Sequence, residues 1–224
     1  MICALVQART TSKRFPNKVL KHILGKPMIW HINERLKVSK ELQDIIYVIP
    51  KSRHNDHLYQ YLKKINVKIF RGNEKDIVDR YYKAAKKYKI DTIVRITADD
   101  PFKDPKVIDK CIKIFKKNND VDYVSNCSYD SSIKATYPEG LEVEILTFKC
   151  LEKIWKNSKK ESEREHLTPF IFNNSNKFKI KGVYSKKNLS DYRLTVDYKS
   201  DMEFAIKIYE ALYNENKIFL LNTI

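Results

Sequence analysis

The sequence has 224 residues and a mass of 26.6 kDa, a length at which a single α/β domain can still share one core. Hydrophobic residues make up 42% of the chain and charged residues 32%, with only four glycines, which excludes a fibrous or low-complexity protein. The formal net charge is +16, a value that raises the question of nucleic-acid binding. However, the lysines are spread over almost every expected helix, which is typical of an evenly solvated surface.

The cysteines and the apolar runs bear on the compartment. Cys3, Cys111, Cys127 and Cys150 lie far apart without a C-x-x-C pair, so they predict free thiols in a reducing compartment. No run approaches the roughly 18 apolar residues that a membrane span needs. The first apolar run begins at Ile2, without the charged and apolar regions of a secretion signal. We therefore expect a cytoplasmic protein that requires neither a membrane nor a nucleic acid.

Apolar runs of strand length alternate with helical patterns along the first half of the chain. Such alternation indicates stacked βαβ units, so the expected fold class is α/β with a mainly parallel central sheet. Helices with a 3.6-residue period are expected from Ile77 to Tyr88 and from Pro105 to Phe115, each with one apolar stripe against the sheet. The expected strands cover residues 2–8, 44–50, 67–72, 92–98 and 122–127.

The rhythm changes after residue 128. A polar segment over 128–138 leads into EGLEVEIL at 139–146, whose alternation predicts an amphipathic strand rather than a buried one. No linker interrupts the chain, so we expect one domain over 1–224, with a nucleotide-binding half at 1–127 and an acceptor-binding half at 128–224. The remaining expected elements are a helix over 146–157, a helix containing REHLTPFIF (164–172), strands over 179–185 and 194–198, and a helix from residue 200.

The most informative segment is the loop that leaves the first strand, residues 8–20. Arg9, Lys13, Arg14 and Lys18 fall within ten residues there, directly after a parallel strand, where open α/β sheets bind their ligands. This loop contains no glycine, so it is neither a Walker loop nor a dinucleotide-binding turn. Side-chain cations must therefore replace the backbone N–H groups of those motifs, and a triphosphate is the natural ligand.

Carboxylates from distant parts of the chain also follow expected strands. Asp99 and Asp100 come after the fourth strand and Asp197 ends the short strand at 194–198, so they could converge at one sheet edge. Mg²⁺ prefers one or two carboxylates together with phosphate oxygens and water. Helix capping is the alternative for an aspartate at a strand end, and it is our interpretation of Asp104, which precedes Pro105. Without a metal, clustered carboxylates would repel each other and strain the site.

Several ordered motifs resemble one enzyme family. RTTSKRFPNKVL, followed by GKPMI, resembles the R-x-x-S-x-R-x-P-x-K-x-L and G-K-P signature of the CMP-KDO synthetase and acylneuraminate cytidylyltransferase superfamily. DIVDRYYKAA, VRITADDPF, EGLEVE, REHLTPF and RLTVDY follow in the order of its SpsF-like branch, which acts in spore coat polysaccharide biosynthesis and usually opens with Q-A-R. One departure is Asn17, where the branch commonly has glycine. The turn there must be made by a residue that tolerates the left-handed conformation less freely.

The resemblance implies a three-layer Rossmann-like, GT-A-like fold and a cytidylyltransferase. Such an enzyme transfers CMP from CTP to an acidic sugar, such as a 2-keto sugar acid of the KDO or nonulosonate type, or to a small phosphate-bearing acceptor, and releases pyrophosphate. It implies Asp99 and Asp197 as Mg²⁺ ligands, and Arg9 and Lys18 as catalytic cations on the triphosphate. Relatives commonly form homodimers through the second half, so an interface is expected over 128–146.

Other residues complete the expected site. Gln7 and Ala8 are expected to read the base through nearby backbone groups, Arg14 supports the loop, and Arg80 either reaches the nucleotide or pairs with Asp79. A solvated strand face remains an alternative for Glu142 and Glu144, and a structural role remains an alternative for His166. The acceptor-side candidates are Glu142, Glu144, Arg164, Glu165, His166 and Arg193.

Two other functions remain open. A GT-A-type glycosyltransferase shares the sheet and a metal-dependent nucleotide site, although the basic loop and the absence of a clear D-x-D triad favour nucleotidyl transfer. A basic nucleic-acid-binding protein is a remote alternative, because the sequence shows no RRM, KH or helix-turn-helix pattern. Release of pyrophosphate would distinguish the first alternative, and a salt-sensitive gel shift the second.

Overall fold

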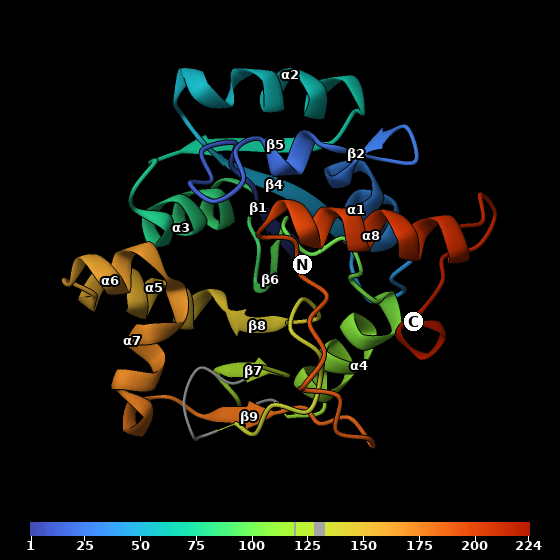
Figure 1. The fold of residues 1–224 in the computed structure, drawn as a ribbon. Coiled ribbons are helices and arrows are strands. Elements are labelled where there is room, and N and C mark those ends of the chain that lie inside the picture. Colours follow the sequence, from blue (N-terminus) through green and yellow to red (C-terminus); the bar gives the residue numbers. More distant parts are fainter. Residues whose placement is uncertain (119, 128–132) are drawn as a thin grey trace.

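The computed structural model describes residues 1–118, 120–127 and 133–224, with a seven-stranded sheet at their centre (Figure 1). The strand order is β5-β4-β1-β6-β8-β7-β9, and β8 is antiparallel to both of its neighbours. The other four strand pairs of this sheet are parallel, which confirms the expected mainly parallel sheet. The strands are β1 (Ile2–Gln7), β4 (Asp44–Pro50), β5 (Lys68–Gly72), β6 (Thr92–Thr97), β7 (Tyr123–Ser125), β8 (Glu144–Thr147) and β9 (Ile180–Gly182), while β2 (His22–Ile23) and β3 (Lys26–Pro27) form a small hairpin.

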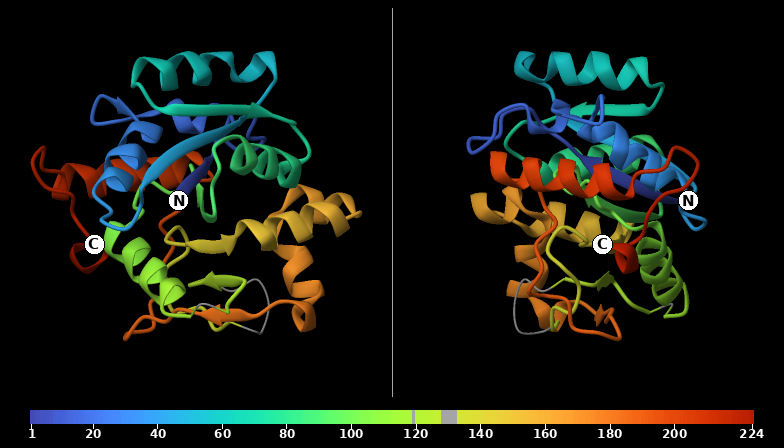
Figure 2. Two further views of the ribbon diagram at one scale, coloured as in Figure 1. Left: turned by 180° about the vertical axis from the view of Figure 1, so that it is seen from behind. Right: turned by 45° about the vertical axis from the view of Figure 1, so that its right-hand side comes forward.

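Helices cover both faces of the sheet, so the fold has the three layers that were expected (Figure 2). Successive residues of β1 point to opposite faces: Ala4 and Val6 belong to one apolar core, and Cys3 and Leu5 to the other. The first core is closed by α1 (Met28–Lys37), α2 (Asp56–Lys64), α4 (Pro105–Lys116) and α8 (Lys199–Leu212), and the second by α3 (Ile77–Lys87), α5 (Phe148–Asn157) and α7 (Leu167–Asn173). The short helix α6 (Glu161–Glu165) contacts α3 and α7.

Helix starts follow the capping residues in the sequence. The carboxylate of Asp104 accepts hydrogen bonds from the backbone N–H groups of Lys106 and Val107, and Pro105 occupies the first turn of α4. The interpretation of Asp104 as a helix cap is therefore confirmed. Asp76 caps α3 in the same way.

The segment EGLEVEIL is not the amphipathic strand that its alternation predicts. β8 covers only residues 144–147 and lies between β6 and β7, with Glu144, Ile145 and Leu146 all buried. Both of its edges are hydrogen-bonded within the chain, so β8 itself cannot form the expected homodimer interface. The rest of the expected interface covers 128–143, of which 128–132 lie outside the described residues.

Two further expectations on secondary structure are wrong. The expected helix through REHLTPFIF is broken at His166, which is extended and separates α6 from α7. Pro169 explains the break, because it lacks an N–H group and its ring would clash with the carbonyl of residue 165 in a continuous helix. The segment 194–198 is extended but makes no strand, since its main partners are loops rather than a neighbouring strand.

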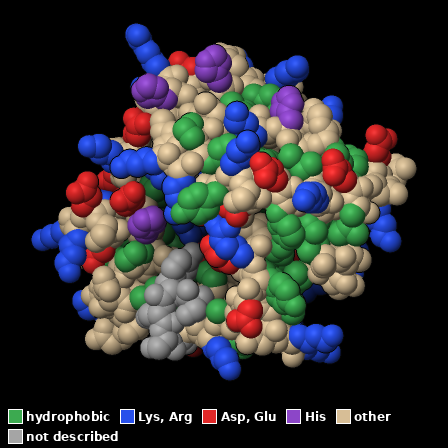
Figure 3. Space-filling view, viewed as in Figure 1, with side chains coloured by type: hydrophobic (Ala, Val, Ile, Leu, Met, Phe, Trp, Pro, Cys, Tyr) green, Lys and Arg blue, Asp and Glu red, His purple; other side chains and the backbone are tan. Residues whose placement is uncertain are grey.

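The cysteines and the surface cations are placed as the sequence predicts (Figure 3). All four cysteines are buried and free, as expected. On the face drawn in Figure 3, lysine and arginine side chains are scattered rather than joined into one stripe. Over the described ranges, no helix is both long enough and apolar enough to cross a bilayer.

Candidate active site

The basic loop after β1 has a defined shape. Asn17 adopts the left-handed conformation with φ 57° and ψ 19°, which confirms the turn expected there, and its N–H group donates to the carbonyl oxygen of Thr10 at 3.0 Å. Thr10 is buried, and its N–H group donates to Oδ1 of Asn55 at 2.9 Å. The loop is thus closed at its base and anchored to the start of α2, while the cations between these points face solvent or a cavity.

A cavity of about 620 Å³, here called the basic cavity, opens at the carboxyl end of β1. Arg9 is exposed within it and makes no hydrogen bond or ion pair with the described residues. Oε1 of Gln7 is buried there, also without a hydrogen-bond partner in the described part of the chain. The lining residues are Gln7, Ala8, Arg9, Thr11, Ser12, Lys13, Arg14, Lys18, Val19, Arg95, Thr97, Ala98, Asp99, Glu165, His166 and Asp197.

A second cavity of about 340 Å³, here called the acidic cavity, lies next to the first. The two share Arg95, Thr97, Asp99 and Asp197, so these residues form a common wall. A ligand in one cavity would meet a ligand in the other at this wall. The acidic cavity is lined by Arg95, Thr97, Asp99, Asp100, Cys127, Glu139, Gly140, Glu142, Glu144, Thr195 and Asp197.

The structure brings Asp99 and Asp197 together through Lys18. The ammonium of Lys18 lies 3.3 Å from Oδ2 of Asp99 and 2.9 Å from Oδ1 of Asp197. It also donates to the carbonyl oxygen of Val196 at 2.8 Å, and its side chain is only 8% exposed. The expectation that these carboxylates repel each other without a metal is wrong, because the ammonium of Lys18 lies between them. Lys18 is also buried, although it belongs to the basic loop after β1.

Asp197 is the more strongly held of the two carboxylates. Its Oδ2 lies 2.7 Å from the guanidinium of Arg14 and 3.3 Å from that of Arg193. Burial alone would raise the pKa of Asp197, but hydrogen bonds and charge from Lys18 and Arg14 outweigh burial and hold that pKa below its usual value. The carboxylate is therefore ionised at neutral pH.

A backbone contact fixes the position of Asp197 relative to Asp99. The N–H group of Val196 donates to the carbonyl oxygen of Asp99 at 2.8 Å, and that of Leu194 donates to Glu139 at 2.7 Å. The extended segment 194–197 is thus held between the loop after β6 and the loop before β8. Asp99 and Asp197 thus converge at one sheet edge, as the sequence predicts.

The shared wall has the donors that Mg²⁺ prefers, although only two of its carboxylates converge. Asp99 and Asp197 expose 34% and 16% of their side chains, so their oxygens can be reached from the cavities. In the described residues, no group of three or more His, Cys, Asp or Glu side chains could hold a metal ion. Two carboxylates alone could hold only an ion that takes its other ligands from phosphate oxygens and water.

Arg95 and Thr97 form part of the common wall, although the sequence analysis did not predict them as site residues. They alternate with their neighbours along β6, so they point to the same side as the residue at position 99. Arg95 forms a buried ion pair with Glu144, whose other oxygen accepts a hydrogen bond of 2.7 Å from Tyr123. Glu144 is thus an internal partner of Arg95 rather than a solvated residue. The R-x-T-x-D spacing was the signal that could have found them.

Lys103 was also missed, and it connects the two sides of the acidic cavity. Its ammonium is 1% exposed and lies 2.8 Å from Oδ2 of Asp100. It also donates to the carbonyl oxygen of Glu142 at 2.6 Å, with a carboxylate oxygen of Glu142 at 3.6 Å. Burial would lower the pKa of Lys103, but Asp100 and Glu142 outweigh burial and raise it. The buried lysine is therefore charged.

Two predicted site residues lie away from both cavities. Arg80 is buried and donates to the carbonyl oxygen of Asn73 at 2.7 Å, and burial lowers its pKa to about 10. It does not pair with Asp79, which pairs with Lys83. Arg164 donates to Oδ2 of Asp76 at 2.5 and 2.9 Å, so it ties α6 to the cap of α3.

The other acceptor-side candidates are divided between the cavities. Glu142 lines the acidic cavity, whereas Glu165 and His166 line the basic one. Burial lowers the pKa of His166, which favours a neutral imidazole at neutral pH. Arg193 pairs with Glu139, Asp197 and Asp201, beside the common wall.

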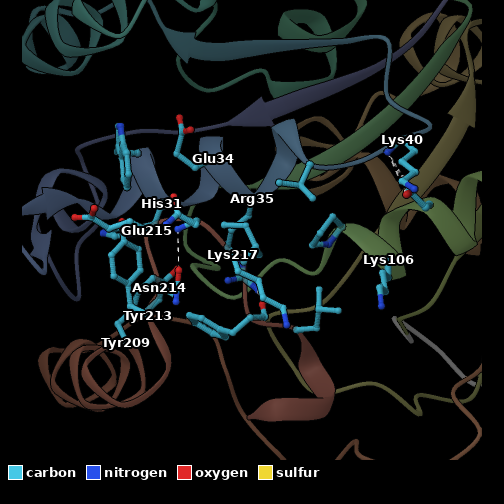
Figure 4. Close-up of a pocket in the computed structure, with 18 residues that line it drawn as sticks. His31, Glu34, Arg35, Lys40, Lys106, Tyr209, Tyr213, Asn214, Glu215 and Lys217 are labelled. Atoms are coloured by element: carbon cyan, nitrogen blue, oxygen red, sulfur yellow. Dashed lines mark hydrogen bonds between the residues drawn. The ribbon is translucent and has the colours of Figure 1, made fainter.

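A third cavity, of about 590 Å³, lies between α1, the start of α4 and the segment after α8 (Figure 4). His31 and Tyr209 stack edge to face at one end, and Arg35 donates from its floor to the carbonyl oxygens of Lys103 and Phe219. None of the predicted site residues lines it. The candidate active site is thus the pair of cavities that share Asp99 and Asp197.

A comparison with protein families matches residues 3–223 to the cytidylyltransferase model. The chain belongs to the cytidylyltransferase family. This confirms the resemblance found in the sequence, and it favours nucleotidyl transfer over sugar transfer for the two cavities. The enzyme is accordingly a nucleotidyltransferase whose family uses CTP.

Similar proteins span nearly the whole chain. The uncharacterized protein MJ1063 of Methanocaldococcus jannaschii is 39% identical over 92% of this chain and 82% of its own. Spore coat polysaccharide biosynthesis protein SpsF of Bacillus subtilis is 27% identical over 93% and 86%. A cytidylyltransferase from Leptospira borgpetersenii superposes with a TM-score of 0.90 at 31% identity, covering 96% of this chain and 89% of that one.

A relative that matches a shorter part of the chain has a name that states its acceptor. The 3-deoxy-manno-octulosonate cytidylyltransferase of Geobacter metallireducens is 30% identical over 111 residues, which are 50% of this chain and 43% of that protein. Its name describes that relative and leaves the acceptor of this cytidylyltransferase to be identified.

Proposed function

We propose that this cytidylyltransferase transfers CMP from CTP to an oxygen of a small acidic acceptor for surface glycan or polysaccharide assembly. The acceptor is an acidic sugar, such as a 2-keto sugar acid, or a small phosphate-bearing compound. The observation that carries the proposal is the common wall: cations and carboxylates meet where a basic and an acidic cavity join.

The basic cavity suits the nucleotide. Arg9, Lys13, Arg14 and Lys18 converge on it from one loop and can balance the charge of a triphosphate and of the departing pyrophosphate. The buried Oε1 of Gln7 would accept a hydrogen bond from an amino group, such as the one that cytosine carries. The base would then be read at the carboxyl end of β1.

The acidic cavity suits the acceptor only if another cation enters with it. Among its described lining residues the one cation is Arg95, which is already paired with Glu144. We therefore propose Asp99 and Asp197 as ligands of Mg²⁺. When bound there, the ion would neutralise phosphate and acceptor charge at the common wall.

In the proposed reaction, an acceptor oxygen attacks the α-phosphorus of CTP. The bond from that phosphorus to the bridging oxygen breaks, and pyrophosphate leaves with the electron pair of that bond. Where the attacking oxygen belongs to a hydroxyl group, its proton passes to water. Holding the two substrates in adjoining cavities aligns them for this step, which needs positioning and charge balance more than covalent catalysis.

A pyrophosphate-release screen tests the function. Each of the four nucleoside triphosphates is combined with a panel of keto-sugar acids and of sugar and small-molecule phosphates, with Mg²⁺ or with EDTA. We expect release only with CTP, an acidic acceptor and Mg²⁺. Equal rates with all four triphosphates would contradict the base specificity, and release of a nucleoside diphosphate would indicate transfer or hydrolysis of the γ-phosphate instead of nucleotidyl transfer.

The cytoplasmic location and the homodimer remain predictions from the sequence. Light scattering at micromolar concentration tests the second of them, and a monomer would contradict it.

A further inference from the structure

All three N–H donors of the Lys18 ammonium have acceptors within the protein. An ammonium has three N–H donors. Those of Lys18 meet three protein oxygens, on Asp99, Asp197 and Val196, within 3.3 Å. A phosphate that binds Lys18 must therefore take the place of at least one of these partners.

Arg14 shows the same relationship with Asp197. Its guanidinium lies 2.7 Å from Oδ2 of Asp197 and stacks over the ring of Tyr198 at 5.2 Å. Asp197 thus holds, with its two oxygens, two of the cations that line the basic cavity. The groups suited to a triphosphate and the groups suited to a divalent cation are paired with each other.

We propose that Asp197 is a specificity-determining residue that makes the site accept the metal-bound nucleotide and reject the free nucleotide. The inference rests on the proposed function. A free triphosphate that draws Lys18 and Arg14 toward itself leaves the Asp197 carboxylate without its partners, partly buried and facing another anion. A nucleotide that brings a divalent cation allows an exchange in which every charge keeps a partner.

Geometry assigns this role to Asp197 more than to Asp99. Asp99 contacts Lys18 at 3.3 Å and exposes 34% of its side chain. Asp197 contacts Lys18 at 2.9 Å and Arg14 at 2.7 Å, with 16% exposed. Asp99 should therefore also disfavour binding of the free nucleotide, but by a smaller free energy than Asp197. Because binding free energies are reciprocal, CTP must strengthen the binding of the divalent cation as much as the cation strengthens the binding of CTP.

Calorimetric titration of CTP tests the proposal in two buffers, one with EDTA and one with Mg²⁺. In EDTA, Asp197→Asn should bind CTP at least about tenfold more tightly than the parent protein, because Lys18 and Arg14 are released for the phosphates. In Mg²⁺ the order should reverse. Glu139→Gln is the matched control: it removes one charge from the acidic cavity, but Glu139 pairs with Arg193 and contacts neither Lys18 nor Arg14. Its affinity for CTP in EDTA should stay close to that of the parent.

Two results would overturn the proposal. One is that Asp197→Asn binds CTP in EDTA no more tightly than the parent; the other is that Glu139→Gln gains as much. If Asp197→Asn does not fold, Asp99→Asn replaces it, with a smaller gain expected and the same contradicting results. A parent protein that binds CTP in Mg²⁺ while neither variant gains in EDTA contradicts this inference alone. Failure to bind CTP in Mg²⁺ contradicts the proposed function as well.

Discussion

The ammonium of Lys103 donates a hydrogen bond of 2.6 Å to the carbonyl oxygen of Glu142, across one side of the acidic cavity. The same ammonium lies 2.8 Å from Oδ2 of Asp100, which stands three residues earlier in the loop after β6. Glu142 in turn accepts hydrogen bonds from the N–H group of Gly140 at 2.9 Å with both carboxylate oxygens. Lys103 therefore fixes the side of the acidic cavity that carries Glu142 relative to the loop that carries Asp99.

We expect Lys103→Met to destabilise the protein by about 3–5 kcal/mol, because it leaves the buried carboxylate of Asp100 without its cation. Urea unfolding measures this loss. Lys113→Met is the control, since Lys113 on α4 is largely exposed and lies 3.8 Å from its partner Glu41, so little change is expected. Where Lys103→Met stays folded, the acceptor KM should rise more than the CTP KM. Equal changes in the two KM values would contradict the positioning role.

The pair formed by Arg95 and Glu144 gives a second prediction. Both side chains are buried, and Tyr123 satisfies the second carboxylate oxygen. Glu144→Gln keeps the shape but removes the charge opposite Arg95, so we expect a loss of about 3 kcal/mol in the free energy of unfolding. Glu152→Gln changes a more exposed glutamate on α5 and should have little effect. Similar small losses in both variants would show that the buried pair contributes little.

The elements of this fold could be predicted where a local pattern decides them. Each of the five strands expected in the first half is present within about two residues, because their apolar runs are set by burial on both faces. The turn at Asn17 was also predictable, since few residues tolerate that conformation. Asp99 and Asp197 could be placed at one edge because both follow extended segments in an α/β sheet, and the resemblance pointed to the same pair.

The missed features depend on contacts that no local pattern contains. The alternation of glutamates in EGLEVEIL indicates a solvated face, but the sheet order places β8 beside β6, where Arg95 pairs with Glu144. Lys103 belongs to a lysine-rich sequence, in which a single buried lysine has no distinguishing signal. Its burial follows from the packing of two loops that lie 39 positions apart.

The depressed pKa of Asp197 predicts a pH dependence of stability. A carboxylate whose pKa is lower in the folded protein stabilises the fold above its unfolded pKa of about 3.9, and this contribution disappears as the pH falls through the folded pKa. The parent should therefore melt at a higher temperature than Asp197→Asn at pH 7, in EDTA, with the difference vanishing in acid. Asp120→Asn, on an exposed pair with Lys179, should melt like the parent throughout. A pH-independent difference would contradict an electrostatic origin.

Arg9 offers the cleanest test of catalysis by the basic loop. Lys18 is less suitable, because it is buried between Asp99 and Asp197 and its removal would disturb the wall itself. Arg9 is exposed in the basic cavity and has no hydrogen bond or ion pair with the described residues, so Arg9→Ala should leave the melting temperature unchanged. Turnover should fall by about 10²-fold or more, the scale expected when one preorganised charge is removed from a transition state.

The control for Arg9→Ala is Lys207→Ala, which removes an exposed cation from α8 without touching either cavity. Initial rates of pyrophosphate release at saturating CTP and Mg²⁺ compare the two variants with the parent. If kcat falls only in Arg9→Ala, the charge of Arg9 stabilises the transition state. A general effect of the lower net charge would slow both variants, because each loses one cation. If only the CTP KM rises and kcat is kept, Arg9 binds substrate and transition state equally, and its catalytic role is contradicted.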